Sequence, residues 1–150
     1  MQTARAQTIN ATSQTATFYV DDLLIGIPID RVQEINRHME ITHVPHAPDA
    51  VRGVINLRGE VVTVLDLRTA LGIPECEVTR STRNVIVQSG DQAVGLQVDR
   101  VSDIVSIPLH EIEPPPANLN GVDGRFFRGV YPTPQGIIVL LDVDEALADS

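Results

Sequence analysis

Residues 52–71 read RGVINLRGEVVTVLDLRTAL, and this stretch decides the fold. Two aliphatic, β-branched runs surround Arg58-Gly59, a pattern that predicts a β-hairpin with its turn at this pair. Asp66 stands at the start of a short helical segment and Gly72 lies just past its end, as N-cap and C-cap residues do. The stretch therefore predicts two strands followed by a helix of about one turn.

The same stretch returns later in the chain. Residues 128–147 read RGVYPTPQGIIVLLDVDEAL and match residues 52–71 at seven of twenty positions, including Arg-Gly-Val and Ala-Leu at the ends. A second pair, GIPIDRVQEI at residues 26–35 and GLQVDRVSDI at residues 95–104, matches at five of ten. Short strands at close spacing without a long helix indicate barrels or sandwiches.

The repeat predicts a mainly β domain of two tandem small five-stranded β-barrels packed together, with a few short helices. The first unit is expected at about residues 15–74 and the second at about residues 83–147, within one domain spanning residues 15–150. Residues 1–14 are polar and are expected to form a flexible N-terminal tail. The sequence leaves open whether terminal strands are exchanged between the units.

Composition narrows the function. The net charge of −9 argues against nucleic acid and anionic membranes as partners, because phosphate contacts need Lys and Arg. One cysteine allows no internal disulfide, and no apolar run reaches the roughly 20 residues of a membrane helix. The N-terminus has no hydrophobic segment typical of a signal peptide. We expect a cytoplasmic protein without direct membrane insertion.

No catalytic constellation is visible, so we expect no enzyme, no cofactor and no metal site. His38, His43 and His46 are close in sequence, but their spacing does not match one helix face and prolines interrupt the segment. The alternative hypothesis is nevertheless a small β-barrel that senses a metabolite or a metal, for which this loop offers the polar ligands.

The repeat raises a question about the role of Arg58. The second copy has Pro132, Thr133, Pro134 and Gln135 around the matched turn, so the fold turns this corner without arginine. Arg58 is either a solvated hairpin tip or a placed charge, and Glu34 is the expected counterion. An exposed pair contributes little stability and is better suited to specificity.

The chain resembles the CheW family, the adaptor proteins of bacterial chemosensory arrays. The motifs that carry the resemblance are FYVDDLLIGIPIDRVQEI, ITHVPHAPDAVRGVINLRGEVVTVLDLR and VGLQVDRVSDIVSI. It implies a stand-alone, non-catalytic adaptor that couples the cytoplasmic tips of methyl-accepting chemoreceptors to the histidine kinase CheA. The kinase's regulatory domain has the same fold, and CheW-like domains join it in rings.

The resemblance also implies two kinds of surface. A receptor-binding seam would be formed by Val32, Glu34, Gly53, Asn56, Arg58 and Val101. Kinase-binding ends would be formed by Met39, Ile41 and Val44 in the first unit and by Leu109, Ile112 and Leu119 in the second. The protein would be cytoplasmic and recruited to receptor arrays.

Overall fold

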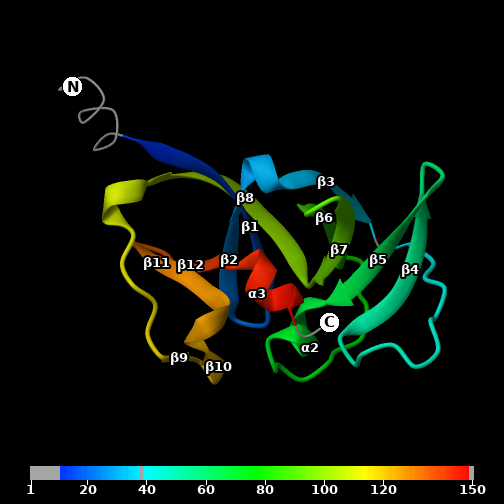
Figure 1. Cartoon of the computed structure of the whole chain (residues 1–150). Helices are drawn as coiled ribbons and strands as arrows, with labels where there is room; N and C mark the ends of the chain where they lie inside the picture. Colours follow the sequence, from blue (N-terminus) through cyan, green and yellow to red (C-terminus); the bar gives the residue numbers. More distant parts are fainter. Residues whose placement is uncertain (1–10, 38, 149–150) are drawn as a thin grey trace.

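The computed structural model describes residues 11–37 and 39–148, and two five-stranded sheets dominate it (Figure 1). The first sheet has the order β11-β12-β2-β1-β8. Its strands are β1 (Thr12–Val20), β2 (Leu23–Pro28), β8 (Arg100–Pro108), β11 (Phe127–Thr133) and β12 (Gly136–Leu141).

The second sheet has the order β3-β6-β7-β5-β4. Its strands are β3 (Val32–Arg37), β4 (Val51–Leu57), β5 (Glu60–Asp66), β6 (Arg83–Ser89) and β7 (Gln92–Val98), and β9 (Asn118–Leu119) pairs with β10 (Val122–Asp123) separately. The helical segments are short: η1 (Ile29–Arg31), α2 (Leu67–Ala70), η2 (Leu109–Glu111), η3 (Gly124–Phe126) and α3 (Val143–Leu147). The predicted mainly β fold with short helices is confirmed.

The prediction of two barrels is confirmed only as two packed five-stranded sheets. Within the described residues, no ladder joins the outer strands β3 and β4, or the outer strands β8 and β11. The loop before β4 reaches it through one isolated bridge, Thr42 to Val54, and the loop before β11 does the same through Glu113 to Val130. Single bridges do not continue the hydrogen-bonded ladder, so neither sheet closes into a barrel.

The internal repeat is visible as one strand arrangement built twice. Read as β8-β1-β2-β12-β11, the first sheet matches the second, β3-β6-β7-β5-β4, and each has one parallel pair in the equivalent place. Sheet membership does not follow the sequential bounds 15–74 and 83–147. Hairpin β1–β2 lies in the sheet of β8, β11 and β12, and hairpin β6–β7 lies in the sheet of β3, β4 and β5. The chain crosses between the sheets after β2 and again after β7.

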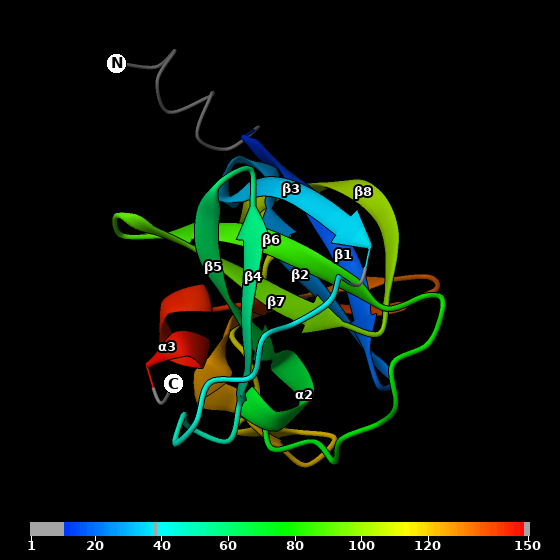
Figure 2. The same cartoon turned by 90° about the vertical axis from the view of Figure 1, so that its right-hand side faces the viewer.

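The main hydrophobic core lies between the sheets, and its central side chains include Phe18, Ile25 and Leu96, all with no exposed area. A second cluster of Ile55, Val62, Val64 and Ile86 is contributed by the second sheet alone. Burial of each such side chain stabilises the fold by about 1.5–3 kcal/mol. Figure 2 shows how the strands of the second sheet curl toward one another.

The helix cap predicted at Asp66 is confirmed, and Asp142 caps the matching helix of the second copy. The Asp66 carboxylate accepts a hydrogen bond from the Arg68 amide at the start of α2, and the Asp142 carboxylate accepts one from the Glu145 amide at the start of α3. Each aspartate satisfies amide groups that have no partner in the first helical turn.

Candidate functional site

The β4–β5 hairpin carries Arg58 at its tip in an uncommon backbone conformation. Arg58 and Gly59 have φ of 52° and 82°, as both central residues of a type I′ turn require. The Asn56 side-chain oxygen accepts a hydrogen bond of 3.0 Å from the Gly59 amide and fixes the turn. A left-handed conformation costs a residue with a side chain about 1–2 kcal/mol, so Arg58 is held at some expense to the fold.

Arg58 pairs with Glu34 through two hydrogen bonds, which confirms the predicted counterion. Its Nη1 donates to Glu34 Oε2 and its Nη2 donates to Glu34 Oε1 at 3.2 Å. The Arg58 side chain is 76% exposed, whereas that of Glu34 is only 20% exposed. The hydrogen bond from Arg58, with a smaller one from Asn36, holds the pKa of the Glu34 carboxyl below its ordinary value. The guanidinium is therefore fixed at the surface while its carboxylate stays charged.

This pair also connects two strands that lie at opposite edges of their sheet. Glu34 is on the outer strand β3, and Arg58 joins β5 to the other outer strand, β4. The contact therefore requires the sheet to curl until its edges approach one another at this end.

The other residues predicted for receptor binding occupy several environments. Val32 begins β3 and is half-buried against the main core, whereas Val101 on β8 is 38% exposed. Asn56 is exposed beside the tip. The structure thus brings Glu34, Asn56 and Arg58 together, whereas Val32 and Val101 lie on outer strands of different sheets.

Gly53 is buried, so it has no side chain or surface to offer a partner. It has φ of 147°, and an added Cβ would overlap the Thr42 carbonyl oxygen and lie 2.6 Å from Ile41 Cγ2. Gly129 takes the matching place in the second copy, where a Cβ would lie 2.9 Å from the Glu113 carbonyl oxygen. The repeated Arg-Gly-Val motif therefore lets the preceding loop dock directly on the strand.

The residues predicted for kinase binding in the first unit are partly inside the fold. Met39 and Ile41 are half-buried and pack against the second hydrophobic cluster. Val44 lines a hollow of about 580 Å³ together with residues of β4, β5 and β7 and with Leu147.

The residues predicted for kinase binding in the second unit differ more in their exposure. Leu109 is 46% exposed, and it lines an apolar hollow of about 190 Å³ together with Ile112 and Ile107. Leu119 lies on β9 and packs against the main core. Of the six residues predicted for kinase binding, Leu109 offers the most exposed apolar surface.

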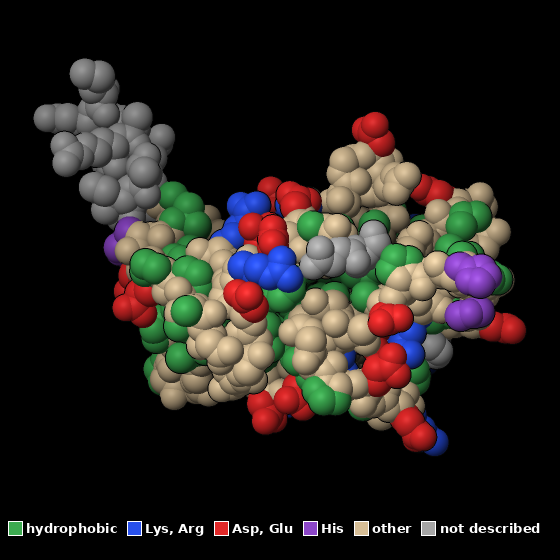
Figure 3. Space-filling model, turned by 60° about the horizontal axis from the view of Figure 1, so that its bottom comes forward, with side chains coloured by type: hydrophobic (Ala, Val, Ile, Leu, Met, Phe, Trp, Pro, Cys, Tyr) green, Lys and Arg blue, Asp and Glu red, His purple; other side chains and the backbone are tan. Residues whose placement is uncertain are grey.

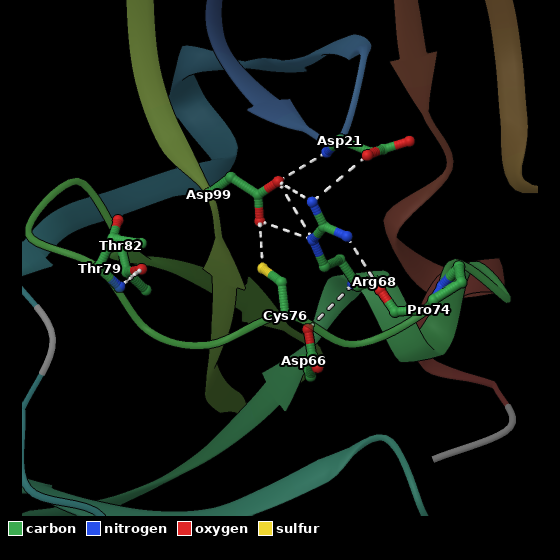
Figure 4. A network of polar contacts seen from close by, with 8 residues as sticks. All are labelled: Asp21, Asp66, Arg68, Pro74, Cys76, Thr79, Thr82 and Asp99. Carbon is green, nitrogen blue, oxygen red and sulfur yellow. Dashed lines mark hydrogen bonds and ion pairs between the residues drawn. The ribbon is translucent and has the colours of Figure 1, made fainter.

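A polar network between the sheets was not predicted from the sequence (Figure 4). Arg68 of α2 donates to both carboxylate oxygens of Asp99 from Nε, at 2.9 and 3.1 Å, and again from Nη2 at 2.7 Å. Arg68 also donates to the Pro74 carbonyl oxygen, and Asp99 accepts from the Asp21 amide at 2.7 Å. The network ties together the β1–β2 turn of the first sheet, α2 after β5 of the second sheet, and the β7–β8 junction, where the chain crosses between the sheets.

The charges in this network are strongly coupled. Burial by itself would raise the pKa of Asp99, but the hydrogen bonds from Arg68 and the Asp21 amide outweigh it and lower that pKa. The hydrogen bond to Asp99 raises the pKa of Arg68. Burial and the nearby Asp99 charge raise the pKa of the Cys76 thiol, whose sulfur lies 3.9 Å from Asp99. The thiol is therefore neutral at physiological pH, and the network is a structural ion pair.

Metal and membrane contacts have no visible counterpart in the described part of the chain. No group of three or more His, Cys, Asp or Glu side chains there could hold a metal ion. His43 and His46 are exposed, and His38 lies outside the described residues. No described helix is long and apolar enough to cross a membrane.

Two five-stranded sheets with one strand order, exchanged hairpins and a charged hairpin tip define a small, mainly β domain with an internal repeat. Residues 14–150 match the family model of the CheW-like domain. The chain belongs to the CheW-like family, as its motifs suggested.

Named relatives agree with this assignment. The chemotaxis protein CheW of Rhizobium meliloti (strain 1021) is 34% identical over 144 residues, which cover 96% of this chain and 93% of the relative. The chemotaxis protein CheW of Helicobacter pylori is 31% identical over 130 residues, which cover 87% and 78%.

A solved structure agrees as well. The crystal structure of the scaffolding protein TtCheW from Thermoanaerobacter tengcongensis matches with a TM-score of 0.81 at 31% identity, covering 89% of this chain and 86% of that one. The family and the fold together support a scaffold or adaptor in chemotaxis signalling.

Proposed function

We propose that this protein is a non-catalytic adaptor that couples the cytoplasmic tips of chemoreceptors to the histidine kinase CheA. The observation that carries the proposal is the tip of the β4–β5 hairpin. Arg58 is highly exposed and left-handed, yet it is held by Glu34 in a place where the second copy turns without arginine. A charge that the fold does not need, displayed in a fixed position, is suited to recognition.

The receptor surface in this proposal consists of Val32, Glu34, Asn56, Arg58 and Val101, with Gly53 acting through the shape of β4. A receptor tip is a helical surface, and helices bind through apolar knobs received by a largely aliphatic surface with few fixed charges. Val101 supplies exposed aliphatic area, and the Arg58–Glu34 pair supplies the fixed charge.

The kinase surfaces in this proposal lie at the two ends of the molecule. One includes Met39, Ile41 and Val44, and the other includes Leu109, Ile112 and Leu119. The kinase regulatory domain would bind at both ends and build rings, in which other CheW-like domains also take part. In this proposal the adaptor acts in the cytoplasm at receptor arrays, without nucleic acid, cofactor or insertion into the membrane.

The test separates the two partners with variants at exposed positions. Val101→Asp should weaken binding to a receptor fragment and leave binding to the isolated kinase regulatory domain nearly unchanged. Leu109→Asp should do the reverse. Ile137→Asp is the matched control, because Ile137 is 48% exposed and belongs to neither surface. A few buried anchors usually dominate an interface, so about a tenfold loss of affinity is expected at the affected surface.

The outcome is decisive because all three positions are exposed. Binding can be measured by calorimetry, with the unfolding midpoint of each variant as the check on folding. If Val101→Asp and Leu109→Asp weaken both partners equally while both remain folded, the assignment of separate surfaces is wrong. If neither variant differs from Ile137→Asp for either partner, the adaptor role of these surfaces is wrong.

A further inference from the structure

Three arginines gather at one end of the second sheet, and none of them belongs to either surface proposed above. Arg37 ends β3, Arg83 begins β6, and Arg80 lies in the loop before β6. Together with Val78 they line an open hollow of about 730 Å³, which we term the arginine hollow. Arg83 donates to the carbonyl oxygens of Arg80 at 2.7 Å and Thr82 at 2.9 Å, so the loop and the strand are fixed together.

The charges of the arginine hollow are not balanced within the described residues. Arg37 and Arg83 are direct cross-strand partners in the β3–β6 register, an arrangement that is unfavourable for like charges. Every ion pair of the described side chains involves other arginines, such as Arg58 with Glu34 and Arg68 with Asp99.

The rest of the molecule makes this concentration of positive charge unusual. The chain has only eleven basic residues and a net charge of −9. On the face shown in Figure 3, acidic side chains are widely spread and basic side chains lie beside them. Most of the described arginines outside the hollow form ion pairs, whereas three arginines line one hollow here.

The repeat shows that the fold does not need these charges. The repeat that places Gly95 opposite Gly26 also places Ser106 opposite Arg37 and Gln14 opposite Arg83. Gln14 and Ser106 are themselves direct partners in the β1–β8 register, so the same sheet position is built once with two arginines and once with two neutral side chains.

We propose that the arginine hollow binds an acidic segment of a partner protein, with carboxylates on the guanidinium groups and an aliphatic side chain against Val78. Guanidinium forms paired hydrogen bonds with carboxylate, and its weak hydration makes it suitable for interfaces. Val78 is 45% exposed at the edge of the hollow and offers an apolar contact that a free anion would not use. The net charge of −9 argues against nucleic acid as the partner.

The test uses a fluorescently labelled short peptide that alternates Glu and Leu, titrated with the full chain and followed by anisotropy. Its counterpart with Gln in place of Glu, and inorganic phosphate as a competitor, are the ligand controls. The variant Arg37→Ser, Arg83→Gln copies the neutral residues of the other sheet. Arg37→Ser alone leaves Arg83 and its hydrogen bonds to the loop in place. Its unfolding midpoint is the check that the fold is retained.

We expect the double variant to weaken binding of the Glu–Leu peptide by about tenfold, as the loss of two exposed charge pairs implies. Raising the salt concentration should weaken binding to the parent protein and affect the double variant much less. Arg128→Gln removes one exposed charge elsewhere and should leave the affinity nearly unchanged.

Four results would overturn the proposal. The first is that the Glu–Leu peptide does not bind, and the second is that the Gln–Leu peptide binds equally well. The third is that phosphate fully displaces the peptide at concentrations near the dissociation constant of phosphate itself. The fourth is that Arg128→Gln and Arg37→Ser weaken binding of the Glu–Leu peptide equally. The third would show a site for small anions, and the last would show only general attraction by charge.

Discussion

Substitution of three glycines by alanine tests how the loops before β4 and β11 dock on their strands. Gly59 has a positive φ of 82° and open space around a would-be Cβ, so Gly59→Ala measures the backbone penalty alone. Gly129 is not in the left-handed region, but its Cβ would lie 2.6 Å from Ile112 Cγ2 and 2.9 Å from the Glu113 carbonyl oxygen. Gly53 combines a positive φ of 147° with an overlap of its Cβ and the Thr42 carbonyl oxygen.

The expected magnitudes follow from these two contributions. A strained φ costs about 1–3 kcal/mol, and overpacking a close contact costs about 1–3 kcal/mol. Gly59→Ala and Gly129→Ala should therefore each lower the free energy of unfolding by about 1–3 kcal/mol. Gly53→Ala should lower it by about 2–6 kcal/mol, which is a large part of the stability of a typical domain.

Urea unfolding followed by circular dichroism measures all three variants. With a slope of about 2 kcal/mol per M, a difference of about 2 kcal/mol between Gly53→Ala and Gly59→Ala moves the urea midpoint by about 1 M. The slope itself should not change. If Gly53→Ala unfolds at the same urea concentration as Gly59→Ala, the loop does not dock closely on β4, and the account of the Arg-Gly-Val motif is refuted.

The remaining predictions concern charge and burial. Arg68→Met should lower the free energy of unfolding by about 1.5–3 kcal/mol at neutral pH. Because the pKa of Asp99 is lowered in the fold, this difference should persist above pH 3.8 and shrink as the pH falls through the folded pKa; a difference independent of pH in acid would contradict the ion pair. Arg58→Glu and Glu34→Arg should each weaken receptor binding with little change in the unfolding midpoint, and the double reversal should restore part of it; a double-mutant cycle without coupling energy would refute the functional pair. Ile41→Asp should destabilise the fold by about 2–4 kcal/mol more than Leu109→Asp, because Ile41 packs against the second cluster; equal urea midpoints would contradict that packing.

The sequence predicts local structure well where the interacting residues are close along the chain or repeated. The hairpin at Arg58-Gly59 and the caps at Asp66 and Asp142 follow from short-range rules of turns and helix ends. The pairing of Arg58 with Glu34 was predicted from the repeated element that holds Glu34 in the first unit, and the structure confirms it.

Contacts between distant elements could not be predicted in the same way. Arg68 and Asp99 are 31 positions apart, and their contact depends on the crossing of the chain between the sheets. The sequence shows that two units are similar, but two similar units can exchange hairpins without any change in local pattern. The burial of Met39 and Ile41 likewise depends on how far the loop before β4 folds back over the second sheet.

Because this protein builds one sheet arrangement twice, a residue in one copy can be compared with its equivalent in the other. Where both copies have the same residue, as at Gly53 and Gly129, the fold itself explains it through the docking of a loop. Where equivalent residues differ in charge, the shared strand order cannot be the reason for the charge.

Three of the places where the copies differ in charge illustrate this. Arg58 corresponds to Pro134, Arg37 to Ser106, and Arg68 to Asp144. The last difference is compensated inside the molecule, because Arg68 pairs with Asp99 and Asp144 pairs with Arg31 at 3.5 Å. Arg58 is compensated by Glu34 but stays exposed, and Arg37 has no ion-pair partner among the described residues. The degree of compensation therefore separates a structural charge, that of Arg68, from the outward-facing charges of Arg58 and Arg37, which supports the proposal that these two arginines face partners.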